Sequence, residues 1–382
     1  MKIETLLANL ALNSDFKDPY GASHFPIYNT ATFDLKKQEG NDRIYDYSRS
    51  DNPTRNALEN IFAKAENGFG CVCTNTGIAA ISVLFETVLK NGDTVLVEND
   101  SYGGTYRLLK VLSEKNNIKT IYTDFTNLNL VEEELKNNEI ALILCEPPTN
   151  PRLKIIDLEE IGKLSKKHNT LYAEDNSMAT FVSQKPLDLG ADFSVFSTTK
   201  FISGHGSVTA GAVVSKTKEL HQKVRFFANA YGNAQSPMDV YLTSLGLPTL
   251  VYRMKAQEES ALKIAKFLKN SPQIKSVKFP ALEDFEQYDL AKKQMSIIPA
   301  VLTIQLQDEE TANQLINNTK LFGKKVSFGT SDSRLEIPAK MSHATNSKDS
   351  LASKGIDNAT VRISVGLENT EDLIEDLSQA LQ

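Results

Sequence analysis

The sequence is poor in the residues and runs that mark several classes of protein. Its 382 residues include only three cysteines and five histidines, and no stretch approaches the roughly 20 consecutive apolar residues of a membrane span. Cys71-x-Cys73 has no second Cys/His pair at zinc spacing and the histidines are dispersed, so we expect no metal centre. All three cysteines, Cys145 included, lie in apolar stretches and fit the reduced, buried thiols of a cytoplasmic protein. The N-terminal segment carries Glu4 and has no long apolar core, which argues against a signal peptide.

A basic surface is missing as well. Lys and Arg total 42 against 48 Asp and Glu, which gives a formal net charge of −6. Nucleic-acid binding requires a basic face, and the basic residues of this chain are scattered along the sequence. We therefore expect small molecules as partners, and neither nucleic acid nor a membrane.

The length and the order of the apolar runs indicate an α/β fold with more than one domain. A chain of 382 residues is long for one unit at ~100–200 residues per domain. From about residue 70, short β-branched runs alternate with helical patterns, which is typical of βαβ units and a mostly parallel sheet. The runs lie at 70–75, 94–100, 120–125, 141–146, 170–176, 193–198 and 209–215. Such a sheet binds ligands beyond the carboxyl ends of its strands.

The pattern changes after residue 245. A helical stretch over 250–270 leads to strand-like runs at 301–306 and 361–367, which predicts a second, smaller α/β domain. The first residues are irregular and rich in aromatic and turn-forming residues, and we interpret them as an arm that contacts a neighbouring subunit. The predicted division is an arm (1–55), a large domain (56–245) and a small C-terminal domain (246–382).

Lys200 stands in the segment FSTTKFISGHG (196–206), just after one of the strand-like runs. Lysine forms a reversible imine with an aldehyde, and the hydroxyls of Ser197 and Thr199 can donate hydrogen bonds to a phosphate. Taken alone, one lysine among 42 basic residues is more often a solvated surface residue. The segment as a whole predicts a site for an aldehyde cofactor that carries a phosphate.

Three further residues at strand ends fit the same site. Asp175 ends the preceding run, where its carboxylate can keep a cofactor ring nitrogen protonated, although capping of the next helix is an equal alternative. Gly77 lies in the strand-to-helix turn TNTGIAAI (74–81), where backbone N–H groups and the helix dipole favour an anion. Tyr102 follows the next strand, where its ring can stack on a planar cofactor. A single glycine turn is weak evidence, so the prediction depends on the combination.

Together these segments resemble the fold-type I pyridoxal-phosphate enzymes of cysteine and methionine metabolism, and most of all the cystathionine γ-synthases among them. The matching segments span nearly the whole chain in the family's order. They are YDYSRSDNPTR (45–55), TNTGIAAI (74–81), NDSYGGTYRLL (99–109), CEPPTNPRLKIIDL (145–158), AEDN (173–176), FSTTKFISGHG (196–206) and VRISVGLEN (361–369). The resemblance implies a mostly parallel central sheet with helices on both faces, pyridoxal 5′-phosphate as cofactor, and a homotetramer of two active dimers.

The resemblance also implies a role for each matching residue. Lys200 would bind the cofactor as a Schiff base and move protons, while Asp175 would pair with the ring nitrogen. Further cofactor contacts are implied for Gly77, Ile78, Ser197 and Thr199 at the phosphate, for Tyr102 at the ring, and for Tyr47 and Arg49 at the phosphate of an adjacent subunit's cofactor. On the substrate side, Arg362 would clamp the α-carboxylate, Asn150 and Ser327 would line the same pocket, and Asp46, Arg107 and Asp332 are candidates for the distal end.

The implied reaction is a γ-replacement, in which cysteine displaces the O-acyl group of an acylated homoserine and cystathionine forms. Three alternatives remain open: a lyase of the same family that cleaves cystathionine, methionine or cysteine, an O-acylhomoserine sulfhydrylase, and a non-catalytic protein that binds the cofactor. Substrate choice is left open by Asp332, where relatives commonly have Glu, and by Leu245 and Pro248, at positions that are often Arg. A Rossmann dehydrogenase is disfavoured, because no G-x-G-x-x-G follows a first strand.

Overall fold

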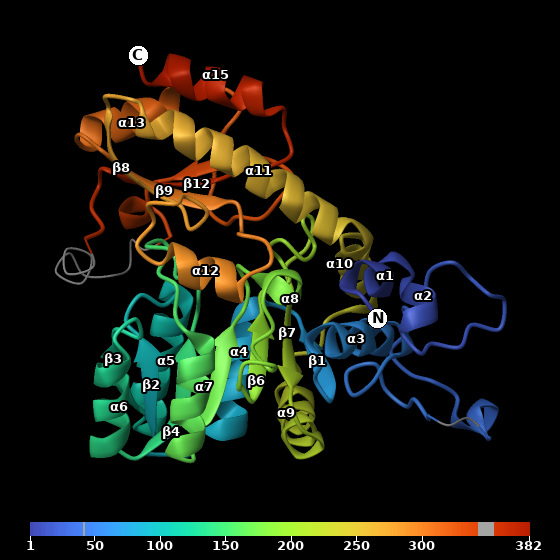
Figure 1. Cartoon of the computed structure of the whole chain (residues 1–382). Helices are drawn as coiled ribbons and strands as arrows, with labels where there is room; N and C mark the ends of the chain where they lie inside the picture. Colours follow the sequence, from blue (N-terminus) through green and yellow to red (C-terminus); the bar gives the residue numbers. More distant parts are fainter. Residues whose placement is uncertain (41–42, 343–354) are drawn as a thin grey trace.

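A seven-stranded sheet forms the centre of the large domain (Figure 1). The protein is described as a computed structural model over residues 1–40, 43–342 and 355–382. The strands are β1 (Gly70–Thr74), β2 (Thr94–Glu98), β3 (Lys119–Thr123), β4 (Ile140–Cys145), β5 (Leu171–Asp175), β6 (Phe193–Phe196) and β7 (Gly211–Ser215). Their order is β1-β7-β6-β5-β4-β2-β3, and every neighbouring pair is parallel except the two that involve β7. The predicted mostly parallel sheet is thus confirmed, with one antiparallel strand inside it.

Helices cover both faces of this sheet, as parallel strands require, because a parallel sheet is buried on both sides. One face packs against α4 (Gly77–Val88), α5 (Gly103–Asn116) and α9 (Lys218–Tyr231). The other face packs against α3 (Pro53–Glu66), α6 (Leu128–Asn137), α7 (Leu158–Lys167) and the short α8 (Thr180–Ser183). All three cysteines lie buried and free in the strands β1 and β4.

Capping side chains fix where the helices begin, and this decides which residues meet at the sheet's carboxyl edge. Thr76 accepts a hydrogen bond from the backbone N–H of Ala79 and starts α4 immediately after β1. Asp157 accepts from the N–H of Glu160 and starts α7, as its position in the sequence predicts. These caps place the first turns of the helices next to the strand ends.

The small domain is built on a five-stranded sheet of order β10-β11-β12-β9-β8. The strands are β8 (Ile274–Lys278), β9 (Val301–Leu306), β10 (Gly323–Lys324), β11 (Arg334–Glu336) and β12 (Thr360–Ser364). Helices α11 (Leu250–Lys269), α13 (Glu309–Asn318) and α15 (Thr370–Ala380) pack on one face of it, and α12 (Tyr288–Gln294) lies beside the large domain (Figure 1). The other face of the sheet is turned toward the large domain and carries the polar side chains used below.

The N-terminal segment extends to one side of the molecule (Figure 1). Its first part is not free, because α1 (Ile3–Ala8) and α2 (Leu10–Asn13) bury Leu6, Leu7 and Leu10 in the large domain's core. A 3₁₀ helix (Leu35–Gln38) follows. Helix α10 (Pro237–Leu245) and two more 3₁₀ helices (Leu247–Thr249 and Pro338–Lys340) complete the elements of the described residues.

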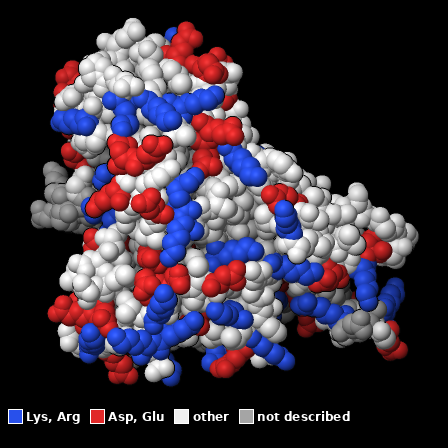
Figure 2. Space-filling view, in the orientation of Figure 1, with Lys and Arg blue, Asp and Glu red and all other residues white. Residues whose placement is uncertain are grey.

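Charges of both signs are interspersed over the face that Figure 2 shows. Among the described residues, no helix combines the length and the apolar character that crossing a bilayer demands.

Candidate active site

A cavity of about 430 Å³ lies at the carboxyl end of the large sheet, where the small domain closes over it. It is lined by eleven of the residues that the sequence predicts for the site: Gly77, Ile78, Tyr102, Arg107, Asn150, Asp175, Ser197, Thr199, Lys200, Ser327 and Arg362. These residues come from seven separate segments of the chain. The fold therefore brings the predicted cofactor and substrate groups into one cavity.

Lys200 lies in the turn that follows β6, and its side chain is directed at the small domain. Its ammonium donates a 2.6 Å hydrogen bond to the hydroxyl of Ser327 and lies 4.8 Å from the ring centre of Phe328. Burial lowers the pKa of Lys200 to about 8, and the nearby guanidinium of Arg362 adds to this effect. A lysine with this pKa is partly neutral near physiological pH, as an amine that attacks a carbonyl carbon or accepts a proton must be.

Arg253, on α11, holds the backbone that follows Lys200. Its guanidinium donates to the carbonyls of Phe201 (2.9 Å), Ile202 (3.4 Å) and Gly246 (2.8 Å), and its Nε donates to the hydroxyl of Thr249 (3.1 Å). Within the described part of the chain it forms no ion pair with a carboxylate. The turn that carries the reactive lysine is therefore fixed by main-chain contacts from a buried arginine.

Asp175 ends β5 and faces the same cavity. Burial raises the pKa of its carboxyl, while hydrogen bonds from the hydroxyl and the backbone N–H of Ser177 and the charge of Lys200 partly offset this. The Ser177 hydroxyl in turn accepts a 2.6 Å hydrogen bond from the N–H of Ser197. Asp175 is thus held in place by a short network, and a cationic ring nitrogen beside it would stabilise its charged form.

A second buried acid, Glu146, lies beside Asp175. Its carboxylate accepts a 2.8 Å hydrogen bond from the backbone N–H of Tyr102. Burial together with the charge of Asp175 raises the pKa of Glu146 well above its ordinary range. The pair therefore carries one charge more readily than two, which leaves that charge on Asp175.

The opposite end of the cavity is built to receive an anion. The N–H groups of Gly77 and Ile78 belong to the first turn of α4, where helix geometry leaves them without intrahelical acceptors. A Cβ added to Gly77 would lie 2.6 Å from the Cβ of Ser197, so only glycine allows the helix to approach this closely. The hydroxyl of Thr199 donates to the carbonyl of Ala210 at 3.2 Å and accepts from its N–H at 3.0 Å. Ser197 and the helix start are therefore the available phosphate donors, and Thr199 also anchors the segment before β7.

These residues fit pyridoxal phosphate as a set. A lysine amine of lowered pKa, a carboxylate held by Ser177 and a helix start that can bind an anion line one cavity, and these are the groups that the cofactor's aldehyde, ring nitrogen and phosphate need. Tyr102 starts α5 and lines the cavity with its ring partly exposed.

Arg362, on β12, forms the substrate end. The guanidinium donates to Oδ1 of Asn150 at 3.0 Å and to the carbonyl of Ser327 at 2.6 Å, and it pairs with Glu336 at 3.0 Å. Its Nε is buried, and none of the described residues accepts a hydrogen bond from it. A buried donor without an acceptor costs free energy, which a substrate carboxylate would recover.

Three predicted residues lie away from this cavity, on the N-terminal segment. Arg49 donates to the carbonyl of Asn229 at 3.3 Å and lies over the ring of Tyr47, and both side chains are outside the cavity lining. The exposed Asp46 accepts a 2.6 Å hydrogen bond from the N–H of Tyr47. The cavity of the same chain therefore does not include these residues.

Of the two remaining candidates for the distal end, only Arg107 lines the cavity. Asp332 lies outside the lining, where its carboxylate pairs with Arg334 at 2.9 Å and with Lys325 at 3.0 Å.

Sequence reasoning did not single out Ser177, Glu146, Glu336 or Arg253. For Ser177 a local signal exists, because a serine two residues after a strand-terminal aspartate can bind its carboxylate. Glu336 is recognisable only from the pairing of β11 with β12, which places it opposite Arg362. Arg253 contacts backbone carbonyls that are remote in sequence, and no motif marks it.

Comparison with known proteins identifies the family to which this chain belongs. The model of the "Cys/Met metabolism PLP-dependent enzyme" family matches residues 4–382. The chain is 39% identical over 377 residues to an L-methionine gamma-lyase of Fusobacterium nucleatum subsp. polymorphum, covering 96% of this chain and 95% of that protein. It is 37% identical over 364 residues to a cystathionine beta-lyase of Lactococcus lactis subsp. cremoris, covering 95% and 94%. The crystal structure of a cystathionine gamma synthase from Xanthomonas oryzae pv. oryzae in complex with cystathionine superimposes with a TM-score of 0.95 at 36% identity, covering 100% of this chain and 98% of that one.

Proposed function

Because the chain belongs to the pyridoxal-phosphate-dependent enzymes of cysteine and methionine metabolism, we propose that it catalyses γ-replacement on an O-acyl-homoserine. The bond between Cγ of the homoserine and the oxygen of the acyl group breaks. The cysteine sulfur forms a C–S bond at Cγ, and the thiol proton leaves with the released carboxylate. The products are cystathionine and a carboxylic acid. The observation that carries this choice is the likeness to the Xanthomonas oryzae synthase over the whole chain.

Lys200 is the group that moves protons in this proposal. When bound, pyridoxal phosphate supplies an aldehyde carbon for the substrate amine and an electron sink for charge that develops at the substrate's carbon atoms. With a pKa of about 8, the Lys200 amine can accept a proton from the substrate's Cα and return it at neutral pH. The hydrogen bond to Ser327 directs the amine toward the cavity.

The other residues bind and orient. Asp175 keeps the ring nitrogen protonated by placing a held negative charge beside it. Arg362 binds the substrate α-carboxylate through its unpartnered Nε, and Asn150 and Glu336 keep the guanidinium in position. Arg107, on α5, lines the same cavity and would contact the leaving carboxylate.

We further propose that the active enzyme is a homo-oligomer, a tetramer of two active dimers, in which Tyr47 and Arg49 reach a neighbour's cofactor phosphate. Their position outside their own chain's cavity supports this, because a guanidinium from a neighbouring subunit would add positive charge beside the cofactor phosphate.

Lyase activity is the second candidate, and the curated relatives favour it. The relatives at 37% and 39% identity are a cystathionine beta-lyase and an L-methionine gamma-lyase. The same proton transfers by Lys200 would then lead to elimination, with a keto acid and ammonia as final products.

Product identification separates the two reactions. The purified enzyme is incubated in parallel with acylated homoserine plus cysteine, acylated homoserine plus sulfide, cystathionine, and methionine, and the products are quantified by mass spectrometry. We expect cystathionine to form faster than keto acid in the first mixture. Keto acid and ammonia as dominant products at saturating cysteine, with cystathionine consumed faster than it is made, would establish a lyase.

A further inference from the structure

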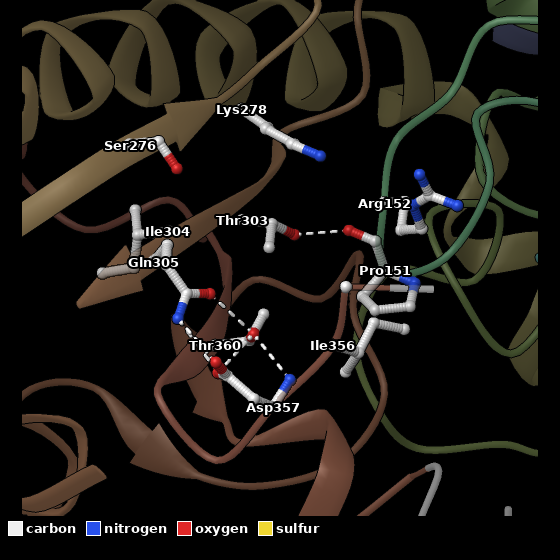
Figure 3. Close-up of a pocket in the computed structure, with 11 residues that line it drawn as sticks. Pro151, Arg152, Ser276, Lys278, Thr303, Ile304, Gln305, Ile356, Asp357 and Thr360 are labelled. Carbon is white, nitrogen blue, oxygen red and sulfur yellow. Dashed lines mark hydrogen bonds between the residues drawn. The ribbon is translucent and has the colours of Figure 1, made fainter. Parts of the chain in front are cut away.

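A second cavity, of about 420 Å³, lies between the small-domain sheet and the segment Pro151–Arg152 of the large domain (Figure 3). Strands β8 and β9 supply its floor, and Lys278 extends from β8 toward the loop that carries Pro151 and Arg152 (Figure 3). Ile304, Ile356 and Pro151 give it an apolar part. A cavity of this size accommodates a small metabolite.

This cavity and the active site share one face of the same sheet. Lys278 pairs with Thr303 of β9, and Thr303 pairs with Arg362 of β12. Residues directly opposite each other in antiparallel strands point to the same face, so the three side chains form one row in which Lys278 and Arg362 are roughly 10 Å apart. Arg362 ends in the active site and Lys278 in the second cavity.

The loop of residues 150–152 lies over the middle of this row and separates the two cavities. The hydroxyl of Thr303 donates a 2.6 Å hydrogen bond to the carbonyl of Pro151. On one side of Pro151, Asn150 accepts a hydrogen bond from Arg362. On the other side, Arg152 lines the second cavity.

Two cations, Arg152 and Lys278, line the second cavity without a direct ion pair to any described residue, although the charges of Asp100 and Glu286 partly offset the lowering of the Lys278 pKa. Within the described residues, the side chains of Arg152 and Lys278 form no hydrogen bond and no ion pair, and the Nε of Arg152 is buried without a partner. Burial lowers the pKa of Lys278, and the charge of Arg152 lowers it further. Like charges held together in this way are stabilised by an anion placed between them.

The carboxylate that lines this cavity is already occupied. Asp357 accepts hydrogen bonds from Gln305 at 3.0 Å, from the hydroxyl of Thr360 at 3.1 Å and from the N–H of Ala359 at 2.8 Å. Figure 3 shows this group of residues on the side away from Lys278. Asp357 therefore stabilises the wall and leaves the two cations available.

We propose that this cavity binds a small anionic effector through a carboxylate or phosphate group held between Arg152 and Lys278, and that the bound anion tightens substrate binding at Arg362. An anion that fixes Arg152 also fixes the adjoining Asn150–Pro151 segment, which positions the guanidinium that receives the substrate carboxylate. The coupling to substrate rests on the proposed function, whereas the binding of the anion does not.

Binding is tested on the protein with its cofactor bound, so that the phosphate cradle at α4 is filled. Inorganic phosphate, succinate and acetate are titrated by isothermal calorimetry at constant ionic strength, and the comparison of phosphate with the carboxylates identifies the preferred group. We expect saturable binding of one of these anions to the wild type, weakened at least about tenfold in Arg152→Met and in Lys278→Met. Lys275→Met is the matched control, because this exposed lysine of the same strand donates only to the carbonyl of Gln307. Thermal unfolding of each variant shows that the fold is retained.

Coupling is tested by KM for the amino-acid substrate with and without the anion that binds. We expect the anion to lower KM about fivefold in the wild type and in Lys275→Met, with kcat little changed, and to have no effect in Lys278→Met. Absence of saturable binding, or equal binding in Lys278→Met and wild type, would overturn the site. Binding without a change in KM would overturn the coupling. Because calorimetry does not depend on turnover, the binding result remains valid even if the γ-replacement assay fails.

Discussion

The ammonium of Lys200 in the large domain donates a 2.6 Å hydrogen bond to the hydroxyl of Ser327 in the small domain. The carbonyl of the same serine accepts from Arg362. Ser327 has a φ of 78°, a conformation that residues other than glycine adopt at a cost. With this backbone geometry, one residue contacts both the lysine that we propose holds the cofactor and the arginine that we propose binds the substrate.

The rate of cofactor uptake is expected to follow the ionisation of Lys200. Only the neutral amine attacks an aldehyde, so uptake by the cofactor-free protein should rise with pH through a midpoint near pH 8, where half of Lys200 has lost its proton, and should level off at higher pH. An unperturbed lysine would give a midpoint near 10.4. Stopped-flow absorbance measures the rate, and borohydride reduction with peptide mapping identifies the modified residue.

Two controls accompany this measurement. Ser327→Ala removes an acceptor that stabilises the ammonium, so the midpoint should move to lower pH. Lys154 is buried but is paired with Glu98 and Asp124, so it should remain unmodified. A label on Lys154, or a midpoint near 10, would contradict the assignment of Lys200.

Asp175→Asn should keep the fold and lose about 10²-fold in turnover, or roughly 3 kcal/mol of barrier. The amide still accepts the hydrogen bonds from Ser177 but cannot hold a ring nitrogen protonated. Steady-state kinetics measures the loss. Asp192→Asn is the control, because Asp192 accepts from the backbone N–H of Tyr172 at a neighbouring strand, away from the cavity. Wild-type turnover in Asp175→Asn would reduce Asp175 to a structural residue.

Gly77→Ala should weaken cofactor binding by about tenfold or more, since relief of the overlap with Ser197 must move the start of α4 or the Ser197 turn. Absorbance titration of the cofactor-free protein gives Kd. Gly103→Ala is the matched control at the first position of α5, where the nearest atom would lie at an ordinary 3.4 Å. Equal Kd values for the two variants would show that the α4 start does not bind the phosphate.

Shared active sites predict complementation between two inactive variants. Arg49→Ala and Lys200→Ala homomers should each be nearly inactive. Dissociation and reassembly of a mixture should restore part of the activity, because some sites then combine an intact arm with an intact lysine. If native mass spectrometry shows hybrids and activity does not return, the arm serves its own subunit's site.

The sequence predicts the large domain better than the small one, for a physical reason. Strands β1, β2, β4, β5 and β6 are buried along almost their whole length and read as largely apolar runs between helices, whereas β3 is a partly exposed edge strand. The antiparallel direction of β7 leaves no trace in such a run. Strand β8, IKSVK, alternates exposed and partly buried positions at the edge of the small sheet, and no apolar run marks it.

The residues of the candidate site also fall into those that the sequence predicts and those that it does not. Gly77, Asp175 and Lys200 each lie at a strand end inside a short motif, so their shared location follows from sheet topology. The network around them depends on pairings remote in sequence, such as Arg362 with Asn150, 212 residues apart, and with Glu336 across β11 and β12. Those pairings are set by tertiary structure and no local pattern contains them.

The contacts of Arg253 bear on how the sequence around the reactive lysine can change. Three of its four hydrogen bonds end on main-chain carbonyls, which every amino acid supplies. Substitutions at positions 201 and 202 therefore need not break this support, provided that the new side chains fit the packing, whereas a Cβ at Gly246 would lie 2.2 Å from the carbonyl oxygen of Ser203. A change of Arg253 itself removes all of these bonds at once. The side chains along the turn can therefore vary, whereas Arg253, distant in the sequence, cannot be replaced without loss of this support.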